Sequence, residues 1–212
     1  MKSVLLVSLL CGAAALPFAS LAVPSDPSVL ARVQDPVKQD PQPAAQDMAA
    51  MMAKAAKFTQ PGPNHEVLKR FLGSWDVELK LTGMPMGGKM VSTGEWLLDG
   101  RVIEMRSEGS MMGQPHRSFL MMGYDNFKQS FVSTMVSSMD TAMLRSEGDL
   151  TRDGKALITY GTLDEYLTGE HDKMVKYVWR FVSDDEIVQE VHDLPIGETG
   201  TKVVELRYTR RK

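Results

Sequence analysis

From residue 74 onward, apolar and polar residues alternate in short runs, which is the pattern of strands with one buried face. The first run, SWDVELKLT at 74–82, places every apolar residue at an odd position. Turn dipeptides separate the runs, and Asp99-Gly100 and Asp153-Gly154 are the strongest, because Asp-Gly supplies the positive φ values of a tight hairpin. The runs predict ten strands, near 74–83, 89–98, 101–109, 116–124, 128–138, 142–151, 155–163, 171–183, 186–194 and 202–210.

No run of helical period interrupts these strands. Consecutive antiparallel hairpins without crossover helices favour a sheet that closes on itself and removes its edges. We therefore predict a mainly β fold, an antiparallel up-and-down barrel of about ten strands that is calycin-like in form and occupies residues 61–212. A two-sheet sandwich is the alternative.

Two helices are predicted ahead of the barrel. A short capping helix covers 64–72, with Asn64 as its N-cap, Gly73 just past its end, and Leu68 and Phe71 on its inner face. A Met-rich amphipathic helix covers 44–60, because Met48, Met51, Met52 and Ala55 fall on one helical face. That face needs a partner, which is either the barrel or a second copy of the chain.

The N-terminal residues predict export. Lys2, an apolar stretch at 4–18 and small residues at 20–22 form the pattern of a signal peptide over residues 1–22. We therefore expect a periplasmic or secreted protein. Residues 23–43 are rich in proline and polar residues and predict a disordered tether. The single cysteine, Cys11, lies inside the predicted signal peptide, so no disulfide or cysteine ligand is expected in the mature protein.

Charge and composition limit the classes of partner that the protein is expected to bind. The chain has 24 basic and 27 acidic residues, a formal net charge of −3, and 43% of its residues are hydrophobic. This balance argues against nucleic acid and against anionic membranes, which require a clustered basic surface. No segment predicts stable membrane insertion, whereas one domain of this size buries a sizeable core.

Gly73-Ser74-Trp75, at the start of the first strand behind a short helix, resembles the lipocalin and fatty-acid-binding (calycin) pattern. In that pattern the tryptophan plugs the barrel floor and an arginine of the last strand covers it. The residues themselves favour the same arrangement, since a buried indole needs a partner and a guanidinium stacks on its face. Arg207 and Arg210 are the candidates for this arginine. The alternative is that Trp75 packs on Phe71 with no arginine.

A wider series of segments extends the resemblance to the whole predicted barrel. The segments are Pro61-Gly62-Pro63-Asn64-His65, Leu72-Gly73-Ser74-Trp75, Leu98-Asp99-Gly100-Arg101, Gly123-Tyr124-Asp125-Asn126, Ser138-Met139-Asp140-Thr141 and Tyr208-Thr209-Arg210-Arg211. Together they resemble a bacterial family known as domain of unknown function 1579. The resemblance implies a lipocalin-like barrel over 61–212 and leaves the activity open.

The predicted interior offers a ligand site. The eighth strand presents an aromatic face and the fifth a face of apolar and hydroxyl side chains, a combination that suits a small ligand held by shape and a few polar contacts. The residues predicted to line the site are Glu95, Arg101, Glu104, Met121, Tyr124, Phe131, Met135, Tyr177 and Trp179. We predict non-enzymatic binding of a small apolar or amphipathic ligand. A structural or protein-interaction module with a filled core is the first alternative.

The second alternative is an enzyme. The Asp99-Gly100 hairpin brings Glu95 and Glu104 close to Arg101 and Arg106, and inward-facing members would form a buried acid and base pair. An exposed cross-strand salt bridge is the other interpretation of the same residues. No nucleophile elbow, phosphate-binding loop or dinucleotide fingerprint occurs in the chain.

No cofactor is predicted, and haem and copper are the two alternatives. No two of the four histidines have zinc-ligand spacing, and His65 is expected to be solvated. An inward-facing His192 could ligate a haem iron, as in the similar nitrobindin-like barrels, but a hydrogen-bonded histidine is the commoner explanation. The chain has 16 methionines, and Met84 with Met86 could bind copper through thioethers, although methionine more often fills apolar interiors.

Overall fold

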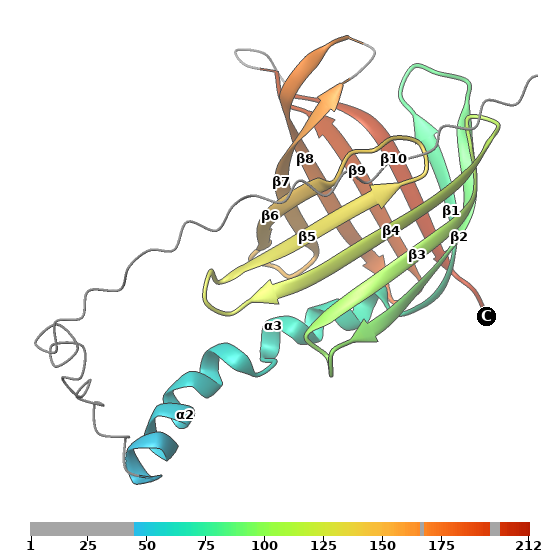
Figure 1. Cartoon of the computed structure of the whole chain (residues 1–212). Helices are drawn as coiled ribbons and strands as arrows, with labels where there is room; N and C mark the ends of the chain where they lie inside the picture. The colour runs from blue at the N-terminus through green and yellow to red at the C-terminus, as the bar shows by residue number, and fades with distance from the viewer. Residues whose placement is uncertain (1–44, 166–167, 196–199) are drawn as a thin grey trace, which may run out of the picture. The chain divides into compact units, whose positions relative to one another are not determined.

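The computed structural model describes residues 45–165, 168–195 and 200–212, so the predicted signal peptide and tether lie outside the described residues. Ten strands form one closed barrel (Figure 1). Their bounds are β1 Gly73–Leu81, β2 Gly87–Leu97, β3 Val102–Met111, β4 Gln114–Asp125, β5 Ser130–Ser137, β6 Leu144–Leu150, β7 Ala156–Glu165, β8 Glu170–Ser183, β9 Glu186–Asp193 and β10 Thr201–Arg210. Each predicted strand is present.

Every strand pairs antiparallel with its neighbours in the chain, and β1 pairs with β10 to close the sheet. In this closing pair, Trp75 stands opposite Arg210 and Leu79 opposite Leu206. The predicted up-and-down barrel is therefore confirmed, and the sandwich alternative is wrong. Short turns explain the outcome, since antiparallel strands joined by hairpins need no crossover.

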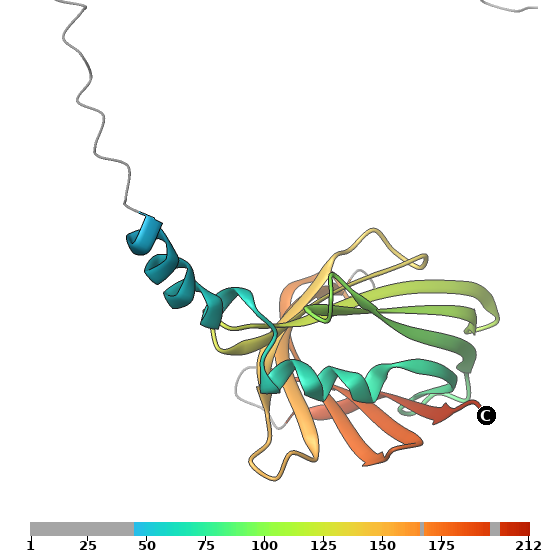
Figure 2. The same ribbon diagram turned by 90° about the horizontal axis from the view of Figure 1, so that it is seen from below.

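The capping helix differs in detail from its prediction. It consists of one α-helical turn, α3 Pro63–Glu66, followed by the 3-10 segment η2 Val67–Phe71. Its N-cap is Gly62 and not Asn64, because proline, with its fixed φ and missing N–H, is preferred at the first helical position and Pro63 occupies it. Figure 2 shows α3 and η2 lying across one end of the barrel, which we call the closed end.

The Met-rich helix α2 runs from Ala45 to Thr59. Its methionines are exposed, with Met51 at 53% and Met52 at 63% of their full accessible area. Only its C-terminal end is held among the described residues: the Phe58 and Phe127 rings lie 5.3 Å apart, and Asn126 Nδ2 donates to the carbonyl of Gln60 at 2.7 Å. None of the described helices is long and apolar enough to span a membrane.

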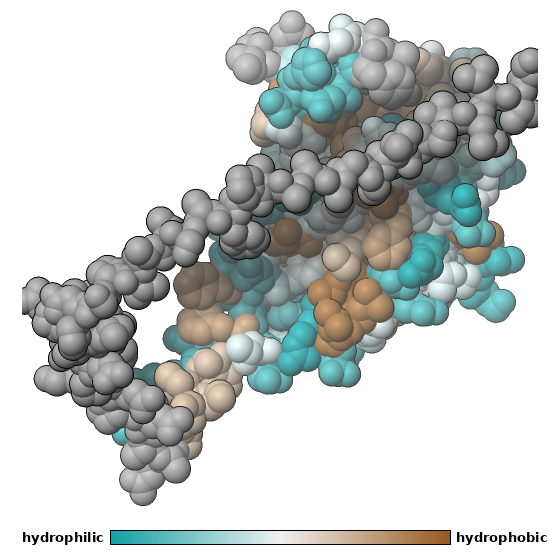
Figure 3. Space-filling view, in the orientation of Figure 1, coloured by the Kyte–Doolittle hydropathy of each residue, from teal (hydrophilic) through white to brown (hydrophobic). Residues whose placement is uncertain are grey.

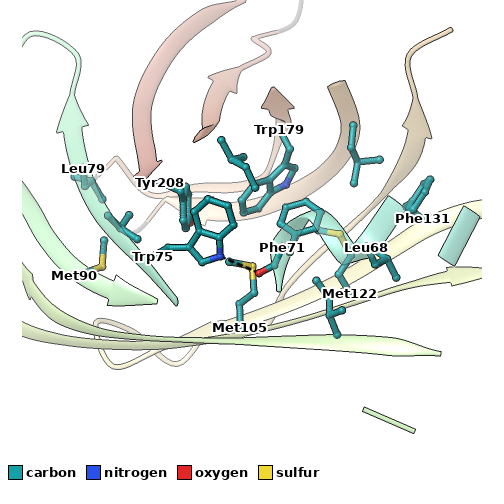
Figure 4. Packing of buried hydrophobic residues seen from close by; sticks show 14 residues of the cluster. Leu68, Phe71, Trp75, Leu79, Met90, Met105, Met122, Phe131, Trp179 and Tyr208 are labelled. Carbon is teal, nitrogen blue, oxygen red and sulfur yellow. Dashed lines mark hydrogen bonds between the residues drawn. The ribbon is translucent and has the colours of Figure 1, made fainter. Parts of the chain in front are cut away.

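The hydrophobic core lies at the closed end, where the helix meets the inner wall (Figure 4). Leu68, Phe71 and Trp75 are fully buried there. The Phe71 ring makes edge-on contacts with Trp179, at a centroid distance of 5.2 Å, and with Phe181, at 5.5 Å. Edge-to-face pairs of this kind add about 0.5–1.5 kcal/mol each beyond the area they bury. The helix therefore contributes its aromatic side chains to the barrel core.

Strand alternation separates an inner from an outer wall. The inner positions include the core residues Val77, Met90 and Met105, and the residues between them face outward. On the face shown in Figure 3, hydrophilic residues lie beside a hydrophobic patch low on the face over β3 and β4. This alternation decides which of the candidate residues can reach the barrel interior.

Candidate ligand site in the barrel interior

Trp75 forms the floor of the barrel interior. Its Nε1–H donates to the carbonyl of Phe71 at 3.1 Å, and the guanidinium of Arg210 lies 4.1 Å from the centre of its ring. Arg210 also donates to the carbonyls of Leu72, at 2.8 Å, and Asp184, at 2.9 Å. Arg210 is therefore the arginine that covers Trp75, a choice between Arg207 and Arg210 that the sequence left open. Arg207 instead faces outward and pairs with Glu186.

The inner wall changes in character between the closed end and the opposite end. Next to the floor, inner positions such as Ile103, Met122 and Leu157 are at most 1% exposed. Toward the opposite end, many apolar inner positions are only half-buried, although Leu79, Met90 and Val175 are buried there too. The half-buried residues are Leu81, Met111, Leu120, Met135, Leu144, Leu163, Val191, Val204 and Leu206. Solvent therefore reaches the inner wall of this half, which we call the open half.

A band of hydroxyl groups lies on the inner wall between the floor and the open half. The hydroxyl belt consists of Ser92, Ser107, Ser133, Ser146 and Thr159, on five of the strands from β2 to β7. Ser107 Oγ donates to Ser92 Oγ at 3.0 Å. Ser133 and Ser146 share a hydrogen bond of 2.8 Å, and Ser146 Oγ donates to Thr159 Oγ1 at 2.9 Å. The belt thus places a band of linked hydroxyl groups on the inner wall.

Tyr177 of β8 stands directly opposite Thr159 in the sheet register. Its Oη is buried and has no hydrogen-bond partner among the described residues. Burial raises the pKa of Tyr177 to about 12, so the phenol stays protonated at neutral pH. Native proteins pair nearly all such buried polar atoms. The unpaired Oη therefore marks a point on the inner wall where a polar partner is favoured.

His116 carries the other unpaired buried polar atom of the described residues, its Nδ1. It stands opposite Gly109 in the register, at an inner position of β4, and is 7% exposed. Desolvation lowers the pKa of His116, with Asp140 acting in the opposite direction, so the ring is neutral at neutral pH. Nearer the open end, Lys173 and Asp193 form an ion pair at 2.8 Å.

Five residues of the predicted lining lie on the inner wall: Tyr124, Phe131, Met135, Tyr177 and Trp179. Phe131 and Trp179 are part of the closed-end core, at 1% and 4% exposure. Tyr124 stacks edge-on against Phe131 at 5.0 Å. Only Met135 and Tyr177 belong to the half that solvent reaches.

Three residues of the predicted lining lie on the outer wall, namely Glu95, Glu104 and Met121. Glu104 falls between the core residues Ile103 and Met105 and must therefore point away from the interior. It is 8% exposed because Arg106 covers it with two hydrogen bonds, of 2.8 and 3.1 Å. The inward acid and base pair considered for catalysis is wrong, since the pair that forms is a salt bridge on the outer wall.

Arg101, the remaining residue of the predicted lining, lies at the closed end outside the interior. A groove of about 440 Å³ opens there, with Phe58, Met121 and Lys128 among its lining residues. Arg101 donates to the carbonyls of Leu98, at 3.1 Å, and Thr59, at 3.2 Å. The polar groups of this groove thus hold the end of α2 in place.

The histidine predictions need two corrections. His192 alternates with inner positions of β9 and faces outward, where its Nε2 lies 3.3 Å from Glu190 Oε2. It cannot ligate a haem in the interior. His65 is not solvated but 5% exposed, and its Nδ1 accepts the N–H of Gly62 at 3.0 Å. Burial lowers the pKa of His65, and the charge of Arg101 adds to this.

Met84 and Met86, considered for copper, lie in the turn between β1 and β2 and are 57% and 52% exposed. The copper hypothesis stays a prediction, because their positions do not decide it. Within the described ranges, no group of three or more His, Cys, Asp or Glu side chains is arranged to hold a metal ion.

A family model described as a protein of unknown function, DUF1579, matches residues 60–210. The chain belongs to this family. The match spans the whole barrel, from the residues before α3 to the end of β10. In this DUF1579 barrel, three of the six segments that carry the resemblance, around His65, Arg101 and Tyr124, meet at the outer groove of the closed end. A search of curated proteins gave no match.

Three solved structures are similar to this DUF1579 barrel. Rv2717c from M. tuberculosis is 12% identical, with a TM-score of 0.48 over 72% of this chain and 100% of that one. The S-type phycobiliprotein lyase CPES from Guillardia theta is also 12% identical, with a TM-score of 0.46 over 80% and 99%. A redesigned β-barrel is 8% identical, with a TM-score of 0.37 over 69% and 96%.

Proposed function

We propose that this protein binds a small apolar or amphipathic ligand in the open half of its barrel. The observation that carries the proposal is the row of half-buried apolar side chains on the inner wall, which includes Val191, Val204 and Leu206. Covering apolar surface in a concave site gains about 25 cal/mol for each Å² removed from water. Most small-molecule sites combine such walls with a few polar groups, a role that the hydroxyl belt fits.

Two alternatives have less support. A structural module with a filled core would bury its inner positions at both ends, whereas inner positions such as Leu81, Met111 and Leu163 are only half-buried. The predicted enzyme would need Glu95 or Glu104 to face inward, and both lie on the outer wall. From the N-terminal sequence we further propose that binding takes place in the periplasm or outside the cell.

Filling the open half should abolish binding. We expect the neutral dye Nile red to bind the wild-type protein, and Val191→Trp to weaken its affinity by at least about tenfold, because the indole occupies the space next to Tyr177. The matched control is Val182→Trp on the outer wall of β8, where the side chain is 57% exposed. Fluorescence titration measures both affinities, and thermal unfolding checks that each variant folds.

The Val182→Trp control should bind Nile red with an affinity within about twofold of the wild type, because its substitution lies on the surface away from the site. Equal affinities for the folded Val191→Trp and Val182→Trp variants, or no binding to the wild type, would refute the proposal.

A further inference from the structure

We infer that the polar group of the ligand is a neutral hydrogen-bond acceptor, such as the carbonyl of a ketone, ester or amide, and that Tyr177 and Thr159 receive it. The inference rests on the proposed function, because it concerns the same open half of the barrel. It goes further because it names the chemical class of the polar group that the inner wall prefers to bind. Carboxylates and amines are both disfavoured.

The first donor is the phenol of Tyr177. Its Oη is buried on the inner wall and meets no partner among the described residues. Because burial keeps the phenol protonated, the group offers an O–H at neutral pH. Leaving a buried donor unpaired is unfavourable, so an acceptor placed beside Tyr177 recovers the lost hydrogen bond.

The second donor is the hydroxyl of Thr159. A hydroxyl group has one hydrogen to donate. Ser146 donates to Thr159, so Ser133 must be the donor in its bond with Ser146, and the hydrogen of Thr159 is left over at the end of this chain of three. Thr159 is 1% exposed and stands opposite Tyr177 in the register. Two residues that each carry an unused donor therefore stand opposite one another on the inner wall.

The charges on the inner wall explain the preference for a neutral group. Among the inner positions of the described strands, Lys173 is neutralised by Asp193 at 2.8 Å, and Arg210 is engaged behind Trp75. Glu165, at the end of β7, also has an interaction partner. A carboxylate at the hydroxyl belt would therefore be buried without a counter-cation, and an ammonium group without a counter-anion. Burying an unpaired charge costs far more than burying a carbonyl that accepts hydrogen bonds.

The apolar part of the ligand has a continuous path from this point. Val191 stands opposite Tyr177 on β9, and Val204 stands opposite Val191 on β10. Both are half-buried inner positions of the open half. A carbonyl at Tyr177 and Thr159 thus leaves an attached alkyl or ring system against these valines, with its far end toward the open end.

Probes of one chain length test the inference: 2-dodecanone, dodecanoic acid and dodecylamine, each titrated by displacement of Nile red at pH 7.5. We expect the ketone to bind at least about tenfold more tightly than the acid or the amine. Tyr177→Phe should weaken ketone binding by about fivefold to tenfold, the equivalent of one hydrogen bond, and leave the acid unaffected. Thr159→Val provides a second variant should Tyr177→Phe fold poorly.

The matched control is Tyr160→Phe, the same chemical change at an outer position of β7 that is 48% exposed. It should leave the ketone affinity unchanged. Acid or amine binding as tightly as the ketone, or a ketone affinity that Tyr177→Phe does not change, would overturn the inference and leave the proposed function standing. A wild-type protein that binds neither Nile red nor any of the three probes would overturn both.

Discussion

Trp75→Ala is expected to lower the free energy of unfolding by about 4 kcal/mol, the usual cost of deleting a large buried aromatic side chain. Trp75 is fully buried, it is the donor to the Phe71 carbonyl, and its ring lies under Arg210. Its removal leaves a cavity at the barrel floor and a buried carbonyl without its partner. Urea unfolding followed by far-UV circular dichroism measures the change.

The matched control for the floor is Tyr160→Ala, which removes an aromatic ring from the outer wall, where it is 48% exposed. Surface substitutions of this kind change stability by about 0.5 kcal/mol. A loss for Trp75→Ala no larger than the loss for Tyr160→Ala would show that the indole does not support the barrel.

Gly94→Ala is expected to destabilise the barrel by about 3 kcal/mol, which is the upper end of the usual cost of overpacking a well-packed site. A Cβ at residue 94 would lie 2.1 Å from the carbonyl oxygen of Phe71 and 3.0 Å from its carbonyl carbon. These are backbone atoms, and the same oxygen accepts the Trp75 hydrogen bond. β2 and the capping helix would have to move apart, and this movement would break their contact at the closed end of the barrel.

Gly62→Ala is the comparison for Gly94→Ala. A Cβ there meets nothing within 4 Å, and the φ of −132° is open to any residue. We expect a change of under about 1 kcal/mol for this variant in the same urea titration. If Gly94→Ala were as stable as Gly62→Ala, the close approach of η2 to β2 would not be a feature of the folded protein.

The strands could be predicted from the sequence because period-two alternation and Asp-Gly turns are local signals. The orientation of Glu104 was also available, since Ile103 and Met105 on either side of it mark the inner positions of β3. The acidic and basic residues of the hairpin, however, also fit an inward acid and base pair, and this interpretation obscured the signal from the alternation. Proline at the first helical position similarly indicates that α3 starts at Pro63 and not after Asn64.

Apart from Ser133 on the mixed face predicted for the fifth strand, the hydroxyl belt could not be predicted in the same way. Ser92, Ser107 and Ser146 occupy inner positions, and an isolated serine in a strand is indistinguishable from an outward polar residue until the pairing is known. The burial of His65 was missed for a similar reason, because it depends on how α3 packs against Tyr124, a contact between segments far apart in the chain. Both features depend on long-range register and packing, and the local sequence does not encode these directly.

The central claim is that ligands bind inside the open half, and the methionines allow a direct test. In protein labelled with ¹³C at the methionine methyl groups, 2-dodecanone should give intermolecular nuclear Overhauser effects to Met111 and Met135 on the inner wall, and none to Met121 on the outer wall or Met52 on α2. Effects confined to Met121 or Met52, with Met111 and Met135 unchanged at saturating ketone, would contradict the account.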